Sequence, residues 1–182
     1  FSKTVIKDKF KFLNTINYFL KNLTVSIIDL KKKNKNFHAR FSAKRRLYEY
    51  EILNRIGKLT IKNNRSWLVK KKLDLKKMKK GISYLIGTHD FSAFRASSCS
   101  AKNPIRTISK AKIKKVGDKI TVTFESKSFL QKQVRSMVGC LKYVGEKKWK
   151  PERIKLIIRS KKRQLCAPPA PPEGLFLKKV SY

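Results

Sequence analysis

The stretch IRTISKAKIKKVGDKITVTFE, residues 105–125, decides the fold class. It contains two runs rich in Ile, Val and Thr, 105–115 and 119–125, and such runs are typical of β-strands. Gly117 and Asp118 lie between them, and a glycine paired with an aspartate between two strand-like runs predicts a hairpin turn. A short turn of this kind joins antiparallel strands only, so at least this part of the sheet is antiparallel.

Further elements follow on both sides of this hairpin. Alternating polar and apolar residues or Ile- and Val-rich runs predict strands over 23–30, 46–53, 61–69 and 174–182. Helical spacing of apolar residues predicts helices over 9–21, 74–86, 128–144 and 151–161. We expect Asp74 and Ser128 to cap two of these helices, Gly87 and Gly145 to follow their ends, and 89–104 to be a long connection. Because strands and helices do not alternate strictly, the sequence predicts an α+β fold, with a mostly antiparallel sheet flanked by helices.

The chain is strongly basic. Its 182 residues include 47 Lys and Arg against 11 Asp and Glu, a formal charge of +36. No apolar run approaches the roughly 18 residues of a membrane span, which excludes a membrane protein. A charge of this size is tolerated when an anionic polymer neutralises it, and phosphate contacts with lysine or arginine release counterions. This favours nucleic-acid binding over the alternative, that the lysine runs reflect the coding bias of an AT-rich genome.

The three cysteines, Cys99, Cys140 and Cys166, are odd in number and widely spaced. With only His38 and His89 beside them, they do not form a zinc motif, so we expect no metal. Unpaired thiols are typical of a reducing compartment and predict the cytoplasm. The chain starts at a phenylalanine without a signal segment, so we expect it to be part of a longer protein.

Two side chains are candidates for chemistry. Tyr48 shares a predicted strand face with Arg46, where an aromatic ring could support an unstacked base, whereas Tyr50 is better explained as core. Arg135 is predicted to be half-buried on an amphipathic helix, a position that usually requires an anionic partner. Asp90 is the only aspartate in a distinctive context. The sequence contains no Ser/His/Asp pattern, no phosphate-binding glycine loop and no pair of catalytic carboxylates.

Four blocks together resemble the tRNA pseudouridine synthase A family. They are FHARFSA at 37–43, with Arg45 and the YEY strand at 48–50; GTHDFSAFR at 87–95, with Cys99 and NPIRT at 103–107; FL at 129–130 with QVRSMVG at 133–139; and AP at 167–168 through PEGLF at 172–176. The resemblance implies a pseudouridine-synthase-like fold. It also implies isomerisation of uridine to pseudouridine in the anticodon arm of tRNA, with no cofactor, by an enzyme that is usually a homodimer.

The resemblance also implies residue roles. Tyr48 matches the tyrosine that contacts the target uridine, and Arg135 matches the arginine that pairs with the catalytic aspartate. Basic residues expected to contact RNA are Arg40, Arg46, Arg95, Arg106 and Lys132. The helix departs from common family versions at 131–133, which we expect to alter RNA contacts rather than chemistry.

The family's aspartate segment, Gly-Arg-Thr-Asp-Ala-Gly-Val-His, has no match in these residues. We therefore expect the chain to be the carboxy-terminal majority of the enzyme and to be inactive alone. Residues 1–36 would be the remainder of a truncated amino-terminal lobe, and 37–182 the carboxy-terminal catalytic and RNA-binding lobe. The alternative is a noncatalytic basic RNA-binding or ribosome-associated protein on the same scaffold. A generic basic ribosomal protein would explain the charge but not Tyr48 or Arg135.

Overall fold

The computed structural model describes residues 6–57 and 65–182. The chain divides into two compact units, Phe1–Ala39 and Arg40–Tyr182. This division falls close to the predicted boundary between 36 and 37, but the assignment of the two parts to lobes of a larger enzyme stays a prediction.

The first unit contains one helix, α1 (Lys9–Phe19), within its described residues. Asp8 caps it, because its carboxylate accepts a hydrogen bond from the Lys11 amide at 3.0 Å. The strand predicted over 23–30 is wrong. The side-chain amide of Asn17 forms hydrogen bonds with both the carbonyl and the amide of Ile27, each at 2.8 Å. The described residues of this unit contain no strand with which 23–30 could pair. A run with strand-like composition but no neighbouring strand cannot form the hydrogen bonds of a β-sheet.

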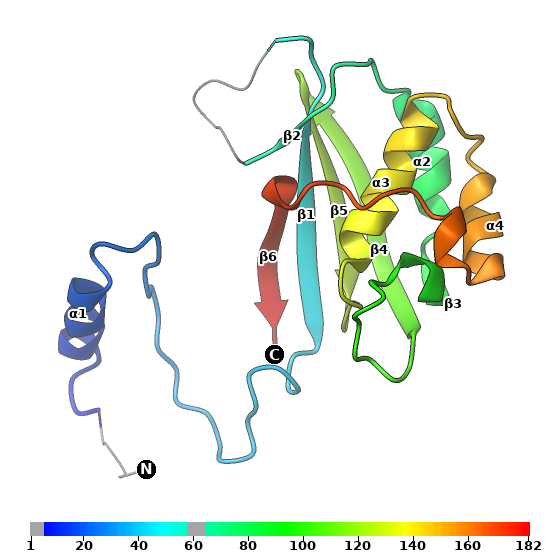
Figure 1. Cartoon of the computed structure of the whole chain (residues 1–182). Coiled ribbons are helices and arrows are strands. Elements are labelled where there is room, and N and C mark those ends of the chain that lie inside the picture. Colours follow the sequence, from blue (N-terminus) through cyan, green and yellow to red (C-terminus); the bar gives the residue numbers. More distant parts are fainter. Residues whose placement is uncertain (1–5, 58–64) are drawn as a thin grey trace. The chain divides into compact units, whose positions relative to one another are not determined.

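The second unit is built on one sheet with the strand order β2-β1-β5-β4-β3, in which β6 also pairs with β1 (Figure 1). The strands are β1 (Arg45–Leu53), β2 (Trp67–Leu68), β3 (Gly87–Asp90), β4 (Ile105–Val116), β5 (Lys119–Ser126) and β6 (Leu175–Ser181). Among the described strands, only the short β1–β2 pairing is parallel. The β4–β5 hairpin is confirmed: Val116 pairs with Lys119, and Gly117 in the turn has a φ of +55°.

Three helices cover one face of this sheet: α2 (Leu75–Ser83), α3 (Gln133–Gly145) and α4 (Arg153–Ser160) (Figure 1). Strand β5 shows why, because Ile120, Val122 and Phe124 alternate with polar residues and are fully buried. They pack in one core with the inner residues of α3, including Met137 and Leu141. The predicted α+β class, an antiparallel sheet flanked by helices, is therefore confirmed.

Two helix ends differ from the prediction. Asp74 caps α2 as expected, through the Lys77 amide at 3.0 Å, but α2 ends at Ser83. Gly87, with a φ of +106°, begins strand β3 instead. This strand lies in part of the predicted 89–104 connection and exists because it pairs with β4, at Gly87 with Ile108.

The start of α3 also differs. Ser128 does not cap it, because α3 begins only at Gln133; the Ser128 amide and carbonyl are instead both hydrogen-bonded to the Ser126 hydroxyl. Lys132 occupies the cap position with a φ of +61°, and Gly145 is the last helical residue rather than the one beyond. Of the strand predicted over 61–69, only Trp67–Leu68 is observed, and residues 61–64 lie outside the described part.

Candidate active site

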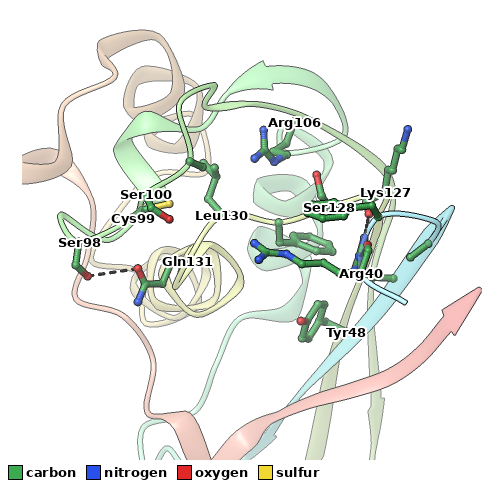
Figure 2. A pocket seen from close by; sticks show the side chains of 15 residues that line it. Arg40, Tyr48, Ser98, Cys99, Ser100, Arg106, Lys127, Ser128, Leu130 and Gln131 are labelled. Atoms are coloured by element: carbon green, nitrogen blue, oxygen red, sulfur yellow. Dashed lines mark hydrogen bonds between the residues drawn. The ribbon is translucent and has the colours of Figure 1, made fainter. Parts of the chain in front are cut away.

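Two adjoining cavities open beside the start of α3. The smaller, about 340 Å³, is lined by both predicted catalytic-site residues, Tyr48 and Arg135. The larger measures about 990 Å³, and Figure 2 shows Tyr48, Arg40 and Arg106 around it. The cavities have lining residues in common, which are Arg40, Tyr48, Phe129, Leu130 and Gln131. The two cavities therefore adjoin, and we call them together the β1–α3 groove.

Tyr48 lies in a strand that is paired on both sides, and it lines this groove. Its backbone lies in β1 between Phe124 of β5 and Leu177 of β6. The half-buried ring meets Phe129 edge to face, with centroids 5.2 Å apart and planes at 86°. Two strands and an aromatic neighbour therefore fix the ring, which is what a platform for a flat base requires.

Arg135 is fixed by main-chain contacts rather than by an acid. Its Nε donates to the carbonyl of Ala170 at 2.6 Å, and its own carbonyl accepts from the Ala170 amide at 2.9 Å. Among the described residues, no carboxylate forms an ion pair with the guanidinium. The half-buried cation is thus oriented at the groove wall and has the geometry to take an anionic partner.

Residues 167–172, which we call the proline strap, hold this arginine. The Tyr50 hydroxyl donates to the Pro171 carbonyl at 2.7 Å. Burial raises the pKa of Tyr50, only partly opposed by the charge of Arg135, so the hydroxyl stays a proton donor. The strap also lies directly on Gly139, where an added Cβ would come within 2.1 Å of the Pro168 oxygen. Tyr50 is fully buried, as its interpretation as a core residue predicted.

The predicted RNA-contact residues occupy different positions relative to the groove. Arg40 and Lys132 line the smaller cavity, and Arg40, Arg46 and Arg106 line the larger. The guanidinium of Arg46 donates to the carbonyls of Lys127 and Arg40, so it also ties the groove wall together. Arg95 lines neither cavity; its Nη1 donates at 3.2 Å to the carbonyl of Ala101, which lines the larger one. Their contacts with RNA stay predictions.

Three groove residues were not singled out for roles from the sequence. Phe129 lay in a recognised block, but its contact with Tyr48 depends on the fold. Lys127 follows β5 directly and adds a further cation. Cys99 also lines the larger cavity, and hydrogen bonding with the Ala101 backbone lowers the pKa of its thiol, aided by Arg95 and Arg106.

The groove is lined by cations, and no Asp or Glu side chain of the described residues lines it. Asp90 lies elsewhere: it accepts from the Ser92 amide at 2.9 Å and pairs with Lys161 at 3.3 Å. It therefore has a structural role in joining η1 (Ser92–Phe94) to the end of α4. The described residues contain no cluster that could hold a metal ion. No described helix has the length and apolar character needed to cross a membrane.

Comparisons with known proteins show the family to which the chain belongs. A sequence model of the tRNA pseudouridine synthase family matches residues 82–182. A tRNA pseudouridine synthase A from Pelagibacter ubique is 52% identical over 180 residues, covering 99% of this chain and 73% of that protein. The enzyme of the same name from Ehrlichia chaffeensis is 43% identical over 182 residues, covering 100% of this chain and 74% of its own. The chain therefore belongs to the tRNA pseudouridine synthase family of isomerases.

Proposed function

We propose that this chain supplies the tyrosine–arginine half of an active site that converts uridine to pseudouridine in the anticodon arm of tRNA. The observation that supports the proposal is the shared cavity of Tyr48 and Arg135. A catalytic aspartate, supplied by a segment that these residues do not contain, would enter this cavity beside Arg135.

Tyr48 and Arg135 suit two different tasks in this reaction. The fixed ring of Tyr48 gives a flipped uracil a surface to pack against, since a base must leave its stack before chemistry on it can start. A guanidinium beside a carboxylate lowers the pKa of the acid and holds its oxygens in a defined orientation. Arg135, oriented by Ala170, is placed to do both.

The reaction is an isomerisation, so its atoms balance without a cofactor. The bond between uracil N1 and ribose C1′ breaks, the uracil turns, and C5 forms the new bond to C1′. The hydrogen at C5 leaves as a proton, and N1 gains one. The Tyr48 hydroxyl, at the groove, is the described group we assign to help remove the C5 proton.

The cations of the groove support tRNA as the substrate. Arg40, Arg106, Lys127 and Lys132 surround a space with no described carboxylate in its wall. Each phosphate that such a group neutralises releases condensed counterions, so binding gains most from a polyanion.

The test is tritium release from tRNA labelled at uracil C5. The chain is assayed alone and fused behind a family segment that carries the Arg-Thr-Asp motif. We expect release by the fusion, loss of release when the motif's aspartate becomes asparagine, and none by the 182-residue chain alone. Binding of tRNA by the fusion without any release would reject the enzymatic proposal.

A second candidate is a noncatalytic RNA-binding protein on the same scaffold. The favouring observation is that none of the described acidic residues reaches the groove, while the formal charge is +36. The fusion experiment separates the two, because a protein adapted to binding alone would retain tRNA without releasing tritium.

Assembly as a homodimer and residence in the cytoplasm are also part of the proposal. The family resemblance supports the homodimer, and three unbridged thiols support a reducing compartment. Light scattering coupled to gel filtration tests the assembly: twice the 21.2 kDa chain mass is expected, and a monomer at micromolar concentration would contradict it.

A further inference from the structure

Two of the three cysteines lie against each other, far apart in sequence. Cys140 is in α3, and Cys166 follows the short 3-10 helix η2 (Arg163–Leu165). Their Sγ atoms are 3.4 Å apart. Disulfide formation would require the two sulfurs to approach further, to about 2.05 Å. Cys99 lines the larger cavity and is hydrogen-bonded elsewhere.

The two thiols have different surroundings. Cys140 is fully buried in the core, and its hydrogen bond with Cys166, together with burial, raises its pKa. Cys166 is half-buried; the hydrogen bond with Cys140 and the charge of Arg163 lower its pKa. The thiolate is the reactive form of cysteine, so Cys166 is the sulfur that meets an oxidant first.

We propose that Cys140 and Cys166 form an intramolecular disulfide when the protein meets hydrogen peroxide. The Cys166 sulfur attacks one peroxide oxygen, breaks the O–O bond and becomes a sulfenic acid, and the other oxygen leaves as water. The Cys140 sulfur then displaces the sulfenic hydroxyl, which leaves as a second water with the Cys140 proton. Two thiols are oxidised and one peroxide is reduced, so atoms and electrons balance.

The bond would form next to the element that holds Arg135. Cys166 directly precedes the proline strap, whose Ala167 is 2% exposed and whose Ala170 binds Arg135. Cys140 lies in the same helix as Arg135. Oxidation therefore ties the strap to α3 and restricts the unfolded chain between 140 and 166, which raises the midpoint of thermal unfolding. Reduction with dithiothreitol should return the midpoint of thermal unfolding to its original value.

The test oxidises the whole purified chain, without tRNA, using equimolar hydrogen peroxide followed by an alkylating quench. Before the alkylating agent is added, the native chain and Cys99→Ser should both have lost about two daltons of mass; after it, each should yield one cross-linked peptide pair, 140 with 166. Cys166→Ala, made in the Cys99→Ser chain, should give no cross-link and react with peroxide at least about tenfold more slowly than Cys99→Ser alone. Cys140→Ala should accumulate a sulfenic acid at Cys166, which dimedone labels.

Peptide mapping of the native chain decides the proposal even if a variant is unstable. Cross-links through Cys99, or oxidation of Cys166 to sulfinic acid without a cross-link, would overturn it. Since no tRNA is present, failure here leaves the isomerase proposal untouched, and failure of tritium release leaves the disulfide untouched.

Discussion

Gly139→Ala tests how the proline strap holds Arg135. A Cβ at residue 139 would lie 2.1 Å from the Pro168 oxygen. Carbon and oxygen need at least about 3.0 Å, so the strap must move away by roughly 0.9 Å. The two hydrogen bonds between Ala170 and Arg135, at 2.6 and 2.9 Å, would lengthen to the limit of hydrogen-bonding distance or beyond.

The cost follows from these contacts. Overpacking of this kind costs about 1–3 kcal/mol, and each of two partly buried hydrogen bonds about 0.5–1.5 kcal/mol. Alanine in place of glycine within a helix returns about 0.5–1 kcal/mol. We therefore expect Gly139→Ala to lower the free energy of unfolding by about 1–5 kcal/mol.

Urea unfolding measures this loss. Both tryptophans, Trp67 and Trp149, lie in the unit that contains the strap, so their fluorescence follows its unfolding. The matched control is Gly57→Ala, where the nearest atom to the added Cβ, the Arg55 Nε, is 3.9 Å away. We expect the control to stay within about 0.5 kcal/mol of the native chain. Equal stability of the two variants would refute the tight strap contact.

Four further results are expected. Tyr50→Phe leaves a carbonyl of the strap without its donor and should cost about 1–2 kcal/mol in urea unfolding; no loss would contradict the bond. In the aspartate-bearing fusion, Arg135→Lys should lower kcat for tritium release by at least about 100-fold, since lysine lacks the planar fork, whereas exposed Arg159→Lys should not. The logarithm of tRNA affinity should fall by about 0.7–0.9 per log unit of salt for each phosphate neutralised, and a flat response would contradict electrostatic binding. Burial raises the pKa of Glu146, but Lys142 and Lys148 together outweigh burial and lower it. The stabilisation from this carboxylate is therefore present above about pH 4.5 and lost as pH falls further, and Glu146→Gln should flatten that acid dependence of the unfolding free energy.

The elements predicted correctly from the sequence are those whose own residues show a strand or helix pattern. The β4–β5 hairpin and β1 show alternation, and α3 shows an apolar face, so local residues suffice. Strand β3 could not be predicted, because GTHD has little strand character and becomes a strand only by pairing with β4. The strand predicted over 23–30 failed for the opposite reason: its composition suits a strand, but the described unit offers no partner.

The candidate site divides in the same way. Tyr48 and Arg135 could be identified from motif resemblance, and their shared cavity is a result of the fold. The contact that orients Arg135 joins residues 35 apart in sequence through a main-chain carbonyl, which leaves no trace in side-chain identity. The Cys140–Cys166 pair, 26 residues apart, likewise follows from the fold, which brings the residue after η2 against α3.

Photocross-linking from position 48 tests the central claim most directly. Tyr48 is replaced by a photoreactive benzoyl-phenylalanine, the chain is irradiated with tRNA, and the joined nucleotide is mapped. The account predicts cross-links concentrated on uridines of the anticodon arm, well above those from the same group at exposed Lys112 of β4. Equal cross-linking from both positions, or cross-links spread evenly over the tRNA, would contradict the assignment of the β1–α3 groove as the place where uridine binds.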